Sequence, residues 1–222
     1  MLLELGLVMV LAFAPALLSL LLTAASGAQE PASSLTVAES AAAMLITVFL
    51  SWSPLLVLAY LLRRNGEGPS TLGLGRFTAR DLGAALLLLL ASYAVVWALT
   101  PVFSGLGTRD VEFLSRDLPL WFLSIQAVLI AVTAGVTEEV LVRGYAQTRL
   151  EQLGLPGPLV VLAPTALWAL LHVYQGLAAV AIIFGLGLLW SIWFHRTRRL
   201  WPLVVAHIFY DLVGLIWILA AG

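Results

Sequence analysis

The sequence predicts an all-α, polytopic integral membrane protein, a helix bundle with about seven transmembrane helices. The chain of 222 residues is 62% hydrophobic and only 10% charged, and its mean hydropathy is +1.04. Because a soluble globular domain has about 25% charged residues, this chain lacks the polar surface that a water-soluble particle needs. Its apolar residues also form long continuous runs, whereas the strands of a membrane β-barrel alternate over about ten residues.

Seven apolar runs account for most of the chain. They cover roughly residues 5–25, 40–62, 82–103, 118–150, 157–173, 177–195 and 201–221. The first run carries Glu4 in place of the basic region of a secretory signal, so we expect it to be a retained helix. Since no internal repeat is present, residues 1–222 are interpreted as one membrane domain. Within it, residues 1–117 are less distinctive and residues 118–215 carry the polar motifs.

Charge and cysteine content narrow the function classes. The net charge of −1 offers no electrostatic basis for binding nucleic acid. The absence of cysteine excludes disulfides and thiolate metal ligands. At the start of the third run, Thr78 to Asp81 resembles a capping box, with Asp in place of Glu or Gln.

Ionisable side chains inside the apolar runs are few. Such groups are costly in a bilayer and usually face a cavity or one another. With a rise of about 1.5 Å per residue, Glu138 and His207 lie ~6 Å from the bilayer centre and Asp211 lies close to it. His172 comes out ~9–10 Å away, so a tilted or broken helix is needed to bring it to the same depth. The set comprises Glu138, Glu139, Arg143, His172, His207 and Asp211.

The spacing of these residues predicts which faces they share. Glu139 and Arg143 are four residues apart and can pair along one helix. Glu138 is rotated by about 100° from Glu139, so the two carboxylates cannot serve one partner equally. One turn before Glu138, Ala134 and Gly135 leave room for a neighbouring helix or a substrate.

A similar spacing occurs in the last run, where His207 and Asp211 are also four residues apart. An aspartate at that distance can accept a hydrogen bond from one imidazole nitrogen and fix the tautomer of the ring. Trp168 stands one helical turn before His172.

Three segments together resemble a known family. "EEVLVR" (138–143), "WALLH" (168–172) and "HIFYD" (207–211) are similar to the EExxxR, FxxxH and HxxxN/D motifs of the CAAX-protease and bacteriocin-processing (CPBP) family of intramembrane peptidases. The chain most resembles prokaryotic members related to type II CAAX prenyl endopeptidases. Trp168 replaces the usual Phe, and Asp211 stands where eukaryotic members have Asn.

The resemblance implies an intramembrane endopeptidase that hydrolyses membrane-associated or lipidated substrates. Glu138 would be the general base, with His172 holding the water. His207 would face the oxyanion and be oriented by Asp211, while Glu139 and Arg143 would form a structural or tuning pair. A second mechanism stays open, in which a divalent metal such as zinc is held by Glu139, His172 and His207.

Other classes of function are compatible with the same residues. The polar groups could have a purely structural role and hold helices together through hydrogen bonds. Alternatively, they could form the relay of an ion- or proton-coupled transporter. A transporter predicts inverted repeats with interrupted helices, which the sequence does not show. A non-catalytic immunity or scaffold protein on the same fold is a further alternative. Membrane lipid is an expected partner under each of these hypotheses. For a peptidase, a membrane-associated peptide or protein substrate is expected as well.

Arginine placement predicts the orientation, because cytoplasmic loops are enriched in basic residues. The loops 63–81 and 195–200 hold seven of the eleven basic residues. The loop 26–39 has no arginine, and the loop 104–117 has mixed charges. We therefore expect a multi-pass protein of a prokaryotic plasma membrane with its N-terminus inside and its C-terminus outside.

A single cysteine at position 70 of the otherwise cysteine-free chain tests this orientation. The residue should be protected from a membrane-impermeant thiol reagent in intact cells and should react after the cells are opened. Labelling of position 70 from outside intact cells would overturn the orientation.

Overall fold

The computed structural model describes residues 1–26, 36–109 and 117–220, and this part of the chain consists of helices joined by turns and loops, with no strand. The α-helices are α1 (Leu2–Ser26), α2 (Val37–Arg64), α3 (Ala79–Phe103), α4 (Leu120–Glu138), α5 (Thr148–Gln152), α6 (Gly157–Leu170), α7 (Leu177–Thr197) and α8 (Trp201–Ala220). A π-helix, η3 (Glu139–Gln147), joins α4 to α5 without a break. Short 3₁₀ turns are η1 (Pro69–Leu72), η2 (Ser104–Leu106) and η4 (Val173–Gln175). Counting α4 to α5 as one rod, the predicted all-α class and its seven helices are confirmed.

The helices have the length and surface of membrane-spanning elements. Within the described residues, four helical stretches are long and apolar enough to cross a bilayer: Val37–Arg64, Ala79–Leu106, Leu120–Gln152 and Leu177–Thr197. Shorter apolar helical stretches are Leu2–Ala14, Gly157–Leu170 and Trp201–Trp217. Large apolar side chains lie on the outside, as Leu87 and Trp97 do on α3. Because soluble monomers rarely expose extended apolar surface, a lipid environment explains this outer face.

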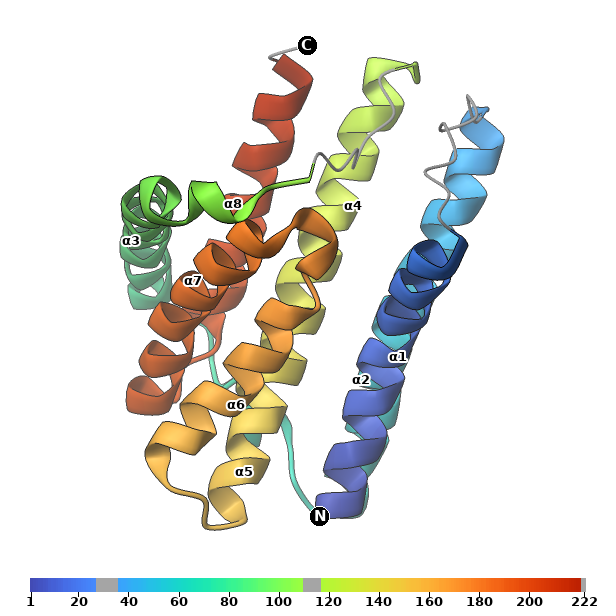
Figure 1. Ribbon diagram of the computed structural model, residues 1–222. Helices are drawn as coiled ribbons and strands as arrows, with labels where there is room; N and C mark the ends of the chain where they lie inside the picture. The colour runs from blue at the N-terminus through green and yellow to red at the C-terminus, as the bar shows by residue number, and fades with distance from the viewer. Residues whose placement is uncertain (27–35, 110–116, 221–222) are drawn as a thin grey trace.

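The helices pack as a bundle around α4, α7 and α8 (Figure 1). On one side, α2 packs against α4, and α1 packs against α2. On the other side, α3 packs against α7 and α8, and α6 packs against α7. The interior between these helices is filled by large side chains such as Trp190, Phe194 and Leu203, all fully buried. Residues 118–213 thus contribute most of the centre of the bundle.

The expected run 157–173 is corrected by the structure, because its helix ends at Leu170. The 14 residues of α6 span only about 21 Å, less than the ~30 Å hydrocarbon core of a bilayer. The turn beyond α6 is held by distant chain segments: Arg109 N donates to Gln175 O at 2.9 Å, and Ala178 N donates to Gly107 O at 3.1 Å. His172 therefore lies in the turn that follows α6 and not on the helix expected over residues 157–173.

Arginine-rich loops meet at one end of the bundle. Leu200 N, between α7 and α8, donates to Gly73 O in the loop between α2 and α3 at 3.1 Å. Arg149 donates to Glu67 of the same loop at 2.8 Å, and this hydrogen bond lowers the pKa of Glu67, so the pair stays ionised. The loops predicted to face one side thus touch one another, while residues 27–35 and 110–116 of the opposite loops lie outside the described residues.

The predicted capping box at α3 is present and has a second role. The Asp81 carboxylate accepts hydrogen bonds from Thr78 N and Thr78 Oγ1, both at 2.7 Å. Arg199 donates two further hydrogen bonds to this carboxylate, at 2.7 and 2.5 Å. One buried aspartate therefore starts α3 and ties it to the segment that precedes α8.

The crossing of α4 and α8 depends on Gly135. A Cβ atom at this position would lie 2.6 Å from Ile208 Cγ1 and 2.9 Å from Ile208 N. The small residue expected to leave room for a neighbour does so, and the neighbour is the backbone of α8 one residue after His207. This contact sets the distance between the helices that carry the glutamates and the third motif.

Gly135→Ala should lower the melting temperature in detergent, because the added methyl group forces two packed backbones apart at a cost of ~1–3 kcal/mol. Gly83→Ala in α3 is the matched control, since a Cβ atom there meets nothing within 4 Å. The control should melt at or slightly above the unaltered protein. Equal losses in the two variants would contradict the close-packing argument.

Candidate active site

The π-helix η3 places the polar residues of the first motif in the interior. All nine residues of η3, from Glu139 to Gln147, are buried. A π-helix is rare, and such segments occur frequently at functional sites. Glu138 is the last residue of α4 and is only partly buried. The change from α- to π-helix therefore falls between the two adjacent glutamates.

Glu139 is the centre of a fully buried cluster. Its Oε1 atom accepts a hydrogen bond from Arg143 Nη1 at 2.9 Å, as the four-residue spacing predicted. The same oxygen lies 2.9 Å from His207 Nδ1. Both Glu139 and Arg143 are 0% exposed. A charge at such a position needs compensation, because removing an ion from water costs several kcal/mol.

Arg143 is enclosed by side chains from α6 and α7. Its guanidinium carbon lies 4.1 Å from the ring centroid of Trp168 and 5.5 Å from that of Trp190. Its Nε atom lies 3.4 Å from Ser191 Oγ, and Thr165 Oγ1 donates to the same hydroxyl at 2.7 Å. Aromatic faces attract a cation, so the guanidinium is held from several directions.

Glu138 is in a different environment from Glu139. Its Oε2 atom accepts a hydrogen bond from the indole Nε1–H of Trp168. Among the described residues, no arginine or histidine lies within ion-pair distance of the Glu138 carboxylate. The charge of Glu139 is thus compensated within the bundle by Arg143, whereas Glu138 has the indole of Trp168 as its side-chain partner among the described residues.

His172 is attached to the same tryptophan. Its Nδ1 atom lies 2.8 Å from the carbonyl oxygen of Trp168, and its ring meets the indole edge-on with centroids 5.2 Å apart. Tyr174 stacks on the imidazole with a centroid distance of 6.0 Å. Because a carbonyl oxygen only accepts hydrogen bonds, Nδ1 carries the proton and Nε2 remains free to accept one.

The predicted orienting partner of His207 is corrected by the structure. His207 Nδ1 lies 2.9 Å from Glu139, whereas Nε2 lies 3.6 Å from Asp211 Oδ2. The second distance is too long for a hydrogen bond. Asp211 is also less enclosed, since 25% of its side chain is exposed. His207 is therefore oriented mainly by Glu139, on another helix, and Asp211 stands beside its opposite nitrogen.

The alternative metal site does not fit this geometry. Among the described residues, no group of three His, Cys, Asp or Glu side chains is arranged to hold a metal ion. Oε1 of Glu139 already receives the Arg143 guanidinium, whose charge repels a cation. Glu139, His172 and His207 are consequently not assigned as a ligand set.

Several contributors to the site carried no signal in the sequence. Trp190, Ser191 and Thr165 lie inside apolar runs, and their spacing from the motifs does not suggest contact. Trp190 lies with its ring centroid 4.8 Å from that of His207, and its Nε1 donates to Ser92 Oγ at 2.9 Å. Polar side chains inside apolar runs are the available clue, since buried polar groups are normally hydrogen-bonded.

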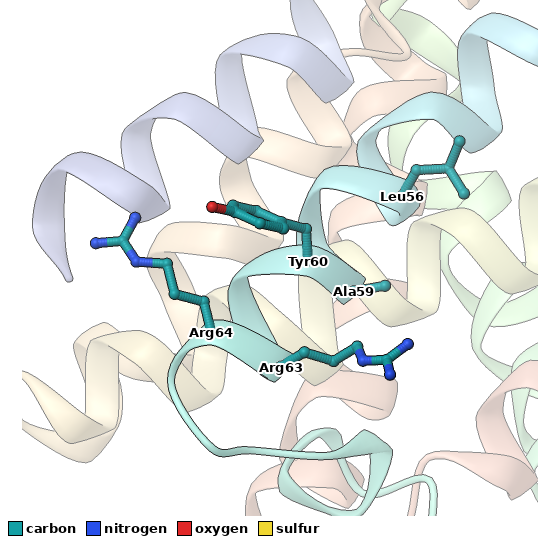
Figure 2. A pocket seen from close by; sticks show the side chains of 5 residues that line it. All are labelled: Leu56, Ala59, Tyr60, Arg63 and Arg64. Atoms are coloured by element: carbon teal, nitrogen blue, oxygen red, sulfur yellow. The ribbon is translucent and has the colours of Figure 1, made fainter.

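Two surface hollows lie apart from this cluster. The first is formed by one helix, α2, and is lined by Leu56, Ala59, Tyr60, Arg63 and Arg64 (Figure 2). The second is lined by Leu106, Gly107, Thr108, Arg109, Val173, Gly176 and Leu177, next to the turn that carries His172. Neither hollow contains a glutamate or histidine of the motifs. The candidate site is therefore defined here by its polar contacts.

The fold and the site together define a multi-pass helical membrane protein with a titratable cluster in its interior. Residues 119–213 match the protein-family model described as "Type II CAAX prenyl endopeptidase Rce1-like". This segment is an Rce1-like type II CAAX prenyl endopeptidase domain, which confirms the resemblance and implies a CAAX-type intramembrane protease. All six polar residues of the three motifs fall inside it. No curated protein and no solved structure matches the chain.

Glu139→Gln should destabilise the protein by ~3–5 kcal/mol, because it leaves the buried Arg143 guanidinium without a counter-charge. Glu151→Gln is the control, since Glu151 pairs with Arg198 while its side chain is 45% exposed. An exposed ion pair contributes only about 0–1 kcal/mol. Thermal unfolding of both variants in detergent measures the difference, and a Glu139→Gln protein as stable as the control would refute the buried pair.

Proposed function

We propose that the protein is an intramembrane endopeptidase that cleaves peptide bonds of membrane-associated or lipidated substrates, with Glu138 as the general base that activates water. The observation that carries this proposal is the unequal environment of the two glutamates. Glu139 is fully buried and bound to Arg143 and His207, so its negative charge is compensated by these partners. Glu138 keeps one oxygen outside its hydrogen bond to Trp168, and that oxygen is available to accept a proton from water.

His172 is suited to help hold the water. With its Nδ1 proton directed to the Trp168 carbonyl, its Nε2 lone pair can accept a hydrogen bond from a water molecule. The turn after α6 brings His172 against the tryptophan that binds Glu138. The proposed base and the proposed water ligand therefore share one anchoring residue.

His207 is proposed to stabilise the oxyanion of the tetrahedral intermediate. In the imidazolium form both ring nitrogens donate, so Nδ1–H is directed to Glu139 and Nε2–H is the donor that can serve the reacting carbonyl. Preorganised donors directed at a developing negative charge are worth about 10²–10³ in rate. Asp211, 3.6 Å from Nε2, is placed to influence this nitrogen electrostatically and not to donate to the oxyanion while ionised.

Glu138→Gln keeps the shape of the side chain and removes the base, so peptidase activity should fall by at least ~10²-fold. The measurement is cleavage of a panel of membrane-anchored peptides by protein in liposomes, with and without a chelator. Circular dichroism and melting temperature should match those of the unaltered protein, because Glu138 makes no ion pair that the substitution would break.

The contrast with Glu139→Gln makes this experiment decisive. Full activity in Glu138→Gln together with loss in a folded Glu139→Gln protein would reverse the roles of the two residues. Full activity in both would remove the case for a glutamate-dependent peptidase. An unaltered protein that cleaves no member of the panel would favour the non-catalytic scaffold or the transporter.

A further inference from the structure

Trp168 touches three members of the candidate site with three different parts of the residue. Its indole Nε1–H donates to Glu138, and its main-chain carbonyl accepts from His172 Nδ1 at 2.8 Å. The face of its ring lies 4.1 Å from the guanidinium carbon of Arg143. A residue that serves only as packing needs none of these polar contacts.

We infer that Trp168 is a positioning residue of the peptidase site, whose indole N–H fixes the carboxylate of Glu138 while its carbonyl fixes the tautomer of His172. This inference rests on the proposed function, in which Glu138 and His172 act on the same water. Trp168 itself touches no reacting atom. Its effect is to hold Glu138, at the end of α4, and His172, in the turn after α6, in one geometry.

The indole nitrogen is the part of this arrangement that another aromatic residue cannot supply. Phenylalanine, the usual residue in the family motif, has no hydrogen-bond donor, whereas the tryptophan Nε1–H only donates. A hydrogen bond to an ionised carboxylate is about twice as strong as a neutral one. It binds Oε2 of Glu138 and leaves Oε1 to meet the water, so the carboxylate does not rotate freely.

The carbonyl of Trp168 acts on His172 through local geometry. The carbonyl oxygen of Trp168 accepts a hydrogen bond from the Nδ1–H of His172, four residues later, where α6 ends and a turn begins. Substitution of the Trp168 side chain leaves this main-chain bond in place. A side-chain variant therefore tests the bond to Glu138 separately from the bond to His172.

Packing holds the indole where these bonds require it. Trp168 is only 3% exposed and lies beside Trp190, with ring centroids 5.9 Å apart. A Cβ atom at Gly187 would lie 2.9 Å from Trp168 Cζ3 and 2.9 Å from Thr165 Cγ2. The glycine of α7 thus provides the space that the larger ring occupies.

Trp168→Phe should lower kcat by about tenfold and leave KM unchanged, because it removes one hydrogen bond to a charged group and keeps most of the packing. The substrate is the panel peptide that the unaltered protein cleaves fastest. Trp52→Phe is the matched control, since its Nε1 also makes a helix–helix hydrogen bond, to Thr133 Oγ1 at 3.2 Å, away from the carboxylates. This control should keep its kcat.

A spectroscopic measurement tests the contact without relying on catalysis. In ¹⁵N-indole-labelled protein, the Trp168 Nε1–H resonance is identified by its loss in Trp168→Phe. It should shift and exchange faster with solvent in Glu138→Ala, while the Trp52 resonance stays in place. A purely structural tryptophan would show no such response to Glu138.

Two results would overturn the inference: an unchanged kcat in a folded Trp168→Phe protein, or a Trp168 resonance that does not respond to Glu138→Ala. If Trp168→Phe does not fold, the Trp168 resonance is assigned instead by elimination, as the one indole resonance that no Trp→Phe substitution of the other tryptophans removes, and the experiment is made on protein with its native Trp168. Absence of cleavage by the unaltered protein would instead overturn the proposed function and the catalytic part of this inference. The resonance shift would then still establish the contact.

Discussion

The buried ion pair between Glu139 and Arg143 is the interaction on which the centre of the molecule depends. Each charge is fully enclosed, and an uncompensated charge in that position would cost several kcal/mol. Three helices surround this pair on η3, through Trp168 of α6, Trp190 and Ser191 of α7, and His207 of α8. The polar cluster therefore joins α6, α7 and α8 to η3 through specific contacts.

This pairing explains how adjacent residues come to have different chemistry. The rotation between consecutive helical positions directs Glu139 into the cluster and Glu138 towards α6. The hydrogen bonds of Glu139 to Arg143 and His207 compensate its charge and hold the helices together. The partial burial of Glu138 leaves its carboxylate accessible. Electrostatic stabilisation of one carboxylate therefore leaves its neighbour without a charged partner, and this is the difference that the proposed mechanism requires.

Much of the fold follows from local sequence properties, and parts of the site do not. Hydropathy predicted the seven helices, and helical spacing predicted the Glu139–Arg143 pair and the close approach at Gly135. The end of α6 was missed because distant chain segments, and not a local breaker, hold the turn at His172. The contacts of His207 with Glu139 and of Trp168 with Glu138 join residues 68 and 30 positions apart. No periodicity within one helix contains that information.

The shortness of α6 has a consequence for the surrounding bilayer. A helix that begins at Gly157 and ends after 14 residues leaves its last carbonyl groups, and the turn that follows, at a depth where lipid offers no hydrogen bonds. Backbone of this kind is stable only against protein or water, and the hydrogen bonds of Arg109 N to Gln175 O and of Ala178 N to Gly107 O supply part of the protein contact. If the protein hydrolyses peptide bonds as proposed, each cleavage consumes one water molecule, and the incomplete span of α6 is where we expect that water to enter the membrane.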